Sequence, residues 1–135
     1  MYRCAAPAAL ALAMSLAALP LTEARAQTAP GHRFFPAQAL RGELVVGAAP
    51  DVQLNGQADR LAPGSRIRGA DNMLAMSGAL TGQKLTVHYT RDGSGLLMDV
   101  WVLNAVELAN KPWPRTAKEA ASWRFDAATQ TWTKS

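Results

Sequence analysis

The chain has 135 residues, a formal net charge of +4, 18% charged residues and one cysteine. This length is enough for one small domain, and a lone cysteine excludes an internal disulfide bond and a thiolate metal cluster. The positive charge is too weak and too scattered to predict a nucleic-acid-binding protein.

The N-terminal residues 1–26 are expected to form a cleaved export signal. Ala5 to Leu21 is an apolar run without charge, and Ala24 and Ala26 form the A-x-A pattern that signal peptidase accepts, so we expect cleavage before Gln27. An uncleaved membrane anchor is the alternative, but the apolar run is at the short limit for a bilayer span. We therefore expect no transmembrane segment in the mature chain.

The mature chain is expected to be periplasmic. It has no cysteine, because Cys4 is removed with the signal, and it has 12 basic and 9 acidic residues, a net charge of +3. Export without disulfide bonds is more typical of a bacterial envelope protein than of a small eukaryotic extracellular domain, which usually needs them.

Three regions are expected after the signal. Residues 27–40 contain two prolines, a glycine and no periodicity, which predicts an extended lead-in with His32 as a solvated side chain. Residues 41–104 predict a β-barrel-like domain. Residues 105–135 predict a connector rich in proline and tryptophan, a short helix and a C-terminal extension.

Short strands and frequent turns dominate residues 41–104. Glu43 to Val46 is a short β run, and Asn55-Gly56 predicts a type I′ turn that sets Leu54 against Gln57 and Val52 against Asp59. The sequence APGS at 62–65 predicts a second turn. Turns at intervals of roughly 8 to 12 residues predict a mainly β fold, a small antiparallel barrel or sandwich of about five to seven strands.

The longest predicted hairpin pairs Lys84 to Arg91 with Leu96 to Leu103 across the loop DGSG. A four-residue loop sets Leu85, Val87 and Tyr89 against Val102, Val100 and Met98, which gives one apolar face directed to the core. On the opposite face, His88 then lies beside Asp99 and diagonal to Trp101. This register separates His88 from Met98.

The C-terminal region is expected to be partly helical. Pro112 and Pro114 make a stiff connector around Trp113, and Thr116 with Glu119 forms a capping box for a short helix. A final hairpin would then pair Trp123 with Trp132 and Phe125 with Gln130, although a helix continuing through Trp123 is an alternative. The tryptophans either dock on the barrel or form a surface for a partner, and the short helix favours docking.

Copper binding is one alternative function for this sequence. Small exported copper carriers hold the cuprous ion with a histidine, methionine sulfurs and a tryptophan face. The candidate ligands here are His88, Trp101, Met73 and Met76. Met73 and Met76 are three residues apart, however, so they would face opposite sides of a regular strand.

A catalytic dyad of His88 and Asp99 is the second alternative, since a carboxylate beside an imidazole raises its basicity. The sequence provides no nucleophile near this pair, and an exposed cross-strand contact is the simpler interpretation. We therefore predict no catalysis.

A basic strip is the third candidate site. Arg60, Arg66 and Arg68 could bind an acidic ligand, because arginine binds phosphate and carboxylate groups with two parallel hydrogen bonds. Asp59 and Asp71 flank this strip, so a solvated and ion-paired strand face is the alternative.

Four segments carry a resemblance to known proteins: LRGELVV, LNGQADRLAPGSRIRG, LTGQKLTVHYT and GLLMDVWVLN. Over residues 41–104 the chain resembles an uncharacterised family of short exported proteins of Gram-negative bacteria. The resemblance implies a small OB- or SH3-like barrel and implies no catalytic residue.

Taken together, these patterns predict a non-catalytic binding or interaction module of the cell envelope, without a cofactor. An envelope protein or a small anionic ligand is its expected partner. The residues expected to take part in binding are Arg60, Arg66, Arg68, His88, Asp99 and Trp101.

Overall fold

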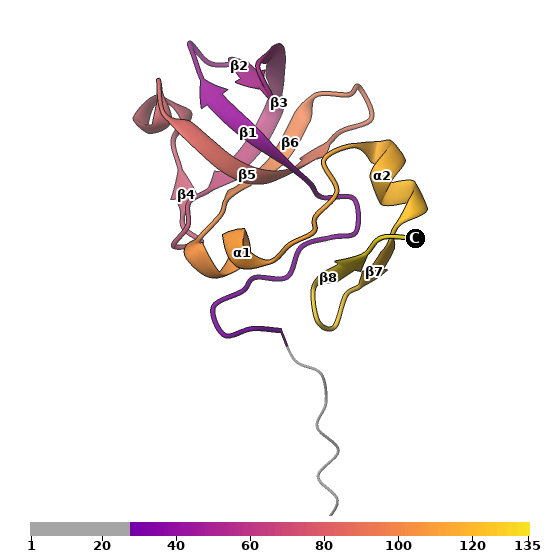
Figure 1. Ribbon diagram of the computed structural model, residues 1–135. Helices are drawn as coiled ribbons and strands as arrows, with labels where there is room; N and C mark the ends of the chain where they lie inside the picture. The colour runs from indigo at the N-terminus through magenta and orange to yellow at the C-terminus, as the bar shows by residue number, and fades with distance from the viewer. Residues whose placement is uncertain (1–27) are drawn as a thin grey trace, which may run out of the picture.

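A computed structural model describes residues 28–135 (Figure 1). The predicted export signal, its cleavage site and Cys4 lie outside these residues. Within residues 28–135, the helices are too short to cross a lipid bilayer.

Five strands close into a barrel. Strand β1 pairs with β2 and β5, β2 pairs with β3, and β6 completes the ring between β5 and β3. All of these pairings are antiparallel except that of β3 with β6, which is parallel. The short strand β4 extends the sheet beyond β3. The prediction of a small, mainly β barrel is confirmed. The strands of this sheet are β1 (Leu40–Val46), β2 (Asp51–Leu54), β3 (Gln57–Arg68), β4 (Leu74–Ala75), β5 (Lys84–Arg91) and β6 (Leu97–Val102).

Aliphatic side chains fill the barrel, because alternate residues of each strand point inward. All but Tyr89 in this barrel core are aliphatic, and each is at most 7% exposed. The barrel core consists of Leu44, Val46, Val52, Leu54, Leu61, Ile67, Val87, Tyr89, Leu97 and Val100. A 3-10 helix, Ser77–Leu80, lies between β4 and β5.

The predicted Asn-Gly turn is confirmed. Asn55 and Gly56 have φ angles of 54° and 79°, which is the left-handed region that a type I′ turn requires at both positions. The register across β2 and β3 also agrees with the prediction, since Leu54 pairs with Gln57 and Val52 with Asp59.

The predicted turn over residues 62–65 is wrong. Strand β3 continues through this segment, and its pairing with β6 moves from Leu61–Leu97 to Arg66–Asp99. Five residues of β3 are therefore matched with two residues of β6. Gly64, at φ +75°, allows the strand to bulge here without ending.

The predicted register of β5 and β6 is also wrong. The structure pairs Val87 with Val102 and His88 with Trp101, which is a shift of two residues. Near the loop, Leu97 pairs with Arg91, so β6 contains one extra residue at this point. The bulge places Leu97 in the barrel core, on the face where a regular strand would place Met98.

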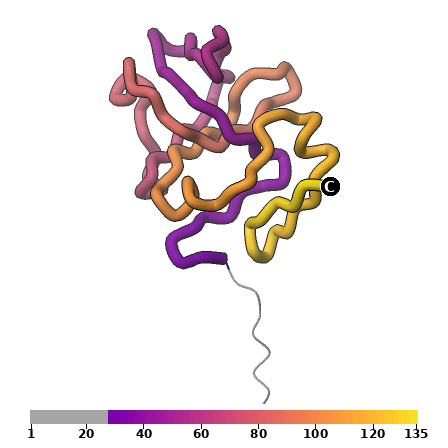
Figure 2. Tube along the Cα trace, in the orientation of Figure 1, coloured from indigo at the N-terminus to yellow at the C-terminus, as the bar shows by residue number. Residues whose placement is uncertain are grey.

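The segments before and after the barrel pack together on its outer side. In Figures 1 and 2 the lead-in runs between α1 (Ala105–Ala109) and the hairpin of β7 (Arg124–Asp126) and β8 (Thr131–Thr133). Hydrogen bonds join it to both, from Asn104 Nδ2 to the Gly31 carbonyl and from Thr28 Oγ1 to the Ala128 carbonyl. The lead-in is therefore held against both α1 and the final hairpin, which the prediction of an extended segment did not include.

A second apolar cluster forms where these segments meet. Trp113 and Trp132 are buried in it with Phe35 of the lead-in, and Trp101 and Trp123 pack at its border. The four tryptophans therefore dock the C-terminal region on the barrel, as the sequence favoured. His32, expected to be solvated, is only 8% exposed.

The C-terminal region contains the predicted short helix and final hairpin, with a different register in the hairpin. Thr116 caps α2 (Ala117–Ser122), which ends before Trp123. The final hairpin is present, but Phe125 pairs with Trp132 instead of Gln130. Helix α1 was not predicted from the sequence, although Asn104 and Glu107 form a capping box at its start.

Candidate functional site

His88 lies at the centre of the contact between the barrel and the segments that cover it. Its side chain points away from the barrel core and is 0% exposed. The ring of Trp113 stacks on the imidazole with centroids 4.1 Å apart, and Phe35 meets it edge-on at 4.4 Å. His88, which was predicted to lie on an exposed face of the β5–β6 hairpin, is therefore buried.

Arg41 fixes the protonation state of His88. The Nε–H of Arg41 donates to Nε2 of His88 over 3.1 Å, and a guanidinium group can only donate, so Nε2 must be an acceptor. The imidazole is then neutral, with its proton on Nδ1. Burial, followed by the nearby charges of Arg41, His32 and Arg33, lowers the pKa of His88 to about 2.

The guanidinium of Arg41 is itself held at three points. Besides His88, it donates to the backbone carbonyls of Asn110 and Glu107, each over 2.9 Å. Burial and the charge of Arg115 lower the pKa of Arg41 to about 10, and the charge of Glu107 acts in the opposite direction. Arg41 therefore ties β1, β5 and the end of α1 together.

Glu107 and Arg33 form a buried ion pair beside this group. The two Glu107 oxygens accept from Nη2 and Nε of Arg33 at 2.6 and 2.9 Å, and Glu107 is 0% exposed. Burial alone would raise the pKa of Glu107. Hydrogen bonds from the Arg33 side chain and from the backbone N–H groups of Arg33 and Asn104 outweigh burial, and the pKa lies below its usual value.

Most polar atoms of this buried cluster have hydrogen-bond partners within the protein. The cluster consists of His88, Arg41, Glu107 and Arg33. Within residues 28–135, the buried side-chain polar atoms without a partner are Nδ1 of His88 and Nε1 of Trp132. No group of three His, Cys, Asp or Glu side chains in this part of the chain could hold a metal ion. The arrangement can position the covering segments and keep His88 neutral.

The structure does not bring His88 and Asp99 together. The direct partner of His88 across the strands is Trp101, and Asp99 accepts from Nε of Arg66 at 3.2 Å. The alternative of a His88–Asp99 dyad depended on the incorrect register.

The methionines of the copper alternative lie away from His88. Met73 and Met76 flank β4 and are 69% and 80% exposed. Strands β3 and β6 separate β4 from β5. Strands are spaced by roughly 4.8 Å, so about 14 Å of sheet lies between those methionines and the His88 strand.

The three arginines of the basic strip have local partners. Arg60 pairs with Asp51 at 3.4 Å, and Arg66 pairs with Asp99 at 3.2 Å. Arg68 donates to the Asn72 carbonyl at 3.4 Å. Arg60 and Arg66 are thus ion-paired on an exposed strand face, although their partners are Asp51 and Asp99 instead of the flanking Asp59 and Asp71.

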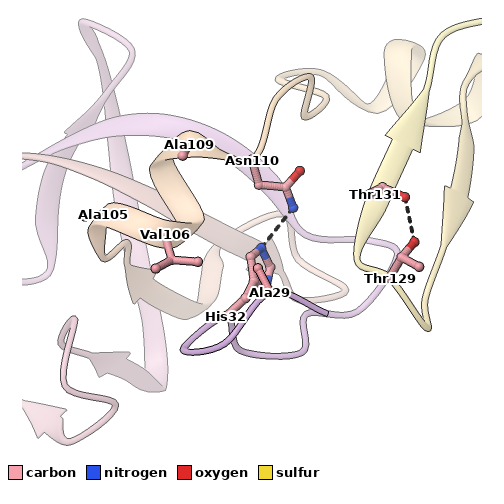
Figure 3. A pocket seen from close by; sticks show the side chains of 8 residues that line it. All are labelled: Ala29, His32, Ala105, Val106, Ala109, Asn110, Thr129 and Thr131. Atoms are coloured by element: carbon pink, nitrogen blue, oxygen red, sulfur yellow. Dashed lines mark hydrogen bonds between the residues drawn. The ribbon is translucent and has the colours of Figure 1, made fainter. Parts of the chain in front are cut away.

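A surface hollow of about 640 Å³ lies between α1 and β8 (Figure 3). Alanine and valine side chains of the lead-in and α1 form much of its wall. Its polar groups bond to each other, His32 to Asn110 at 2.9 Å and Thr129 to Thr131 at 2.7 Å. The walls offer space and apolar surface with few free polar groups.

A second hollow, of about 360 Å³, lies between the connector and the C-terminal strand. We refer to it as the basic hollow, because four of the residues that line it are basic. Its principal lining residues are Arg41, Lys111, Arg115, Lys134, Glu119 and Trp123. These cations were not predicted to form a site. The segment KPWPR, with basic residues on both sides of a tryptophan, was the available signal.

Comparison of the chain with models of protein families, with curated proteins and with solved structures gives no match.

Proposed function

We propose that the protein is an exported, non-catalytic binding module of the bacterial cell envelope, built on an OB-like barrel. The N-terminal sequence supports export, because it has the apolar run and the small residues of a cleaved signal. The strand order supports an OB-like barrel. Three antiparallel strands followed by a parallel β3–β6 pair make the five-stranded Greek-key ring of that fold.

The burial of His88 is the observation that carries this proposal. A general base must reach a substrate proton, and a metal ligand must offer a lone pair. His88 is 0% exposed, and its Nε2 lone pair accepts from Arg41. The side chain best suited to acid–base catalysis or metal binding thus has a structural role, whereas the hollows on the surface are open to a ligand.

Ligand-dependent stability tests this proposal. A ligand that binds the folded state raises the melting temperature by mass action, by an amount that depends on its concentration. The purified protein is heated with the lipid, glycan and protein fractions of envelope extracts, and one fraction is expected to raise the melting temperature in a saturable way. Stabilisation by no fraction would contradict the proposal, as would hydrolytic turnover lost in His88→Ala.

A soft-metal carrier is the second candidate. Nδ1 of His88 has no hydrogen-bond partner, although it carries the ring proton and would have to release it to bind a metal ion, and Trp101 is the direct cross-strand neighbour of His88. Titration with cuprous ion, followed by tryptophan fluorescence, separates the two candidates. The binding-module proposal expects no tight one-to-one endpoint, and an endpoint abolished by His88→Ala would favour the carrier.

A further inference from the structure

We propose that the basic hollow binds a ligand that carries a phosphate group, with Lys111, Arg115 and Lys134 contacting the anion and Trp123 packing against the body of the ligand. This inference rests on the proposed binding function and names its ligand class. The hollow brings together the connector, α2 and the last residues of the chain.

The cations of the hollow differ from most others on the protein in having no carboxylate partner. Among residues 28–135, the ion pairs are made by Arg33, Arg60, Arg66, Lys84 and Arg91. None of these residues lines the basic hollow. Its one acidic residue, Glu119, accepts at 3.3 Å from Thr116 Oγ1 in the cap of α2. The positive charge of the hollow is therefore left for a ligand to neutralise.

Arg41 adds a buried, fixed charge behind the three exposed cations of the hollow. Its guanidinium is held by His88 and two backbone carbonyls, so it stays in place with or without a ligand. It lies close enough to Arg115 for the two charges to oppose each other, which lowers the pKa of Arg41. Like charges gathered around a hollow attract an anion and repel one another in its absence.

Trp123 gives the hollow an aromatic wall. It is partly exposed, and Nζ of Lys134 lies 5.2 Å from the centre of its ring. A ligand ring or ester carbon can lie against the indole while the neighbouring ammonium meets the anion. A volume of about 360 Å³ suits a small molecule or one lipid headgroup.

The charge of the hollow favours phosphate over carboxylate. Three exposed cations and Arg41 stand against one carboxylate, and a phosphate monoester carries between about one and a half and two negative charges at neutral pH. Its three free oxygens can accept from several donors at once, whereas a carboxylate offers two. Arginine and lysine both bind phosphate oxygens well.

Calorimetry with two probes tests the proposal and separates the two sources of phosphate. Phenyl phosphate represents a soluble monoester, and vesicles that contain phosphatidic acid present a monoester headgroup on a lipid, with phosphatidylcholine vesicles as the neutral control. Saturable one-to-one binding of phenyl phosphate is expected for a soluble ligand. Binding of the anionic vesicles alone would assign the site to lipid.

Charge-neutralising variants assign the binding to this hollow. Arg115→Gln and Lys134→Gln are each expected to lower the affinity for the probe by about tenfold, because each removes a charge-assisted hydrogen bond. Lys118→Gln removes the same charge from a residue of α2 that does not line the hollow, so it should leave affinity unchanged. Both side chains chosen for removal are exposed, so the fold should be retained.

The melting temperature of the ligand-free protein provides a second readout. Arg115→Gln should raise it, since it relieves the repulsion between Arg115 and Arg41, while Lys118→Gln should not. Failure of both probes to bind would overturn the phosphate proposal, as would binding unaffected by Arg115→Gln and Lys134→Gln. If an envelope fraction still stabilised both variants, the general binding function would stand without this site.

Discussion

Arg41 and His88 form a buried pair in which a permanent cation donates to a neutral imidazole over 3.1 Å. The pair joins β1 to β5 on the outer side of the barrel, under Trp113. A protonated imidazole could not accept this bond and would place a second positive charge next to the guanidinium. The fold therefore requires His88 to be neutral.

Acid should destabilise the protein through His88. The folded state holds the His88 pKa at about 2, against 6.5 as its ordinary value. Below pH 6.5 the unfolded chain therefore takes up a proton that the folded protein does not, and stability falls as pH decreases from 6.5 towards 2. The expected slope approaches about 1.4 kcal/mol per pH unit for this one group.

Urea unfolding at pH 7, 6 and 5 measures this effect. His88→Gln keeps an oxygen that can accept from Arg41 but cannot titrate, so its stability should change less over this range. The pKa of Glu107 lies below its usual 4.5. The stability that the Glu107 charge contributes is therefore lost only in solution more acidic than the range of this measurement. Equal slopes for His88→Gln and the unmodified protein would contradict the assignment.

Glu107→Gln should destabilise the protein by about 3–5 kcal/mol, because it leaves the buried charge of Arg33 without its counter-ion. Arg33→Met should also be costly, since it leaves Glu107 unpaired. Removing both charges should cost less than the two single changes added together, and a double-mutant cycle by urea unfolding measures this coupling. Additive effects would show that the pair is not coupled.

Local patterns in the sequence predicted the parts of the fold that depend on neighbouring residues. Asn55-Gly56 specified its turn because both residues tolerate positive φ, and Thr116 with Glu119 specified the start of α2. The bulge in β6 could not be predicted, since one extra residue leaves no distinct mark in an alternating apolar strand.

The burial of His88 was missed for a different reason. The residues that cover it, Phe35 and Trp113, lie far from it in the sequence, and an isolated hairpin gives no sign of a second covering layer. The basic hollow likewise unites the connector with Lys134 at the end of the chain. Such sites depend on tertiary contacts, which residue periodicity does not report.

Gly56→Ala should cost about 1 kcal/mol, because the methyl group opposes the φ of +79° in the type I′ turn. No atom lies within 4 Å of the added carbon, so the cost would come from the backbone alone. Gly93→Ala is the matched control, with equally open space and no positive φ. Thermal unfolding should show a lower melting temperature for Gly56→Ala than for Gly93→Ala.

Val100→Asp should unfold the domain, whereas Met98→Asp should be tolerated. Val100 is 1% exposed in the barrel core, and an unpaired carboxylate buried there costs several kcal/mol. A regular strand would direct residues 98 and 100 to the same face, but the bulge places Leu97 in the core and leaves Met98 partly exposed. Circular dichroism melting of the two variants compares these outcomes, and equal destabilisation by both would mean that β6 runs without the bulge.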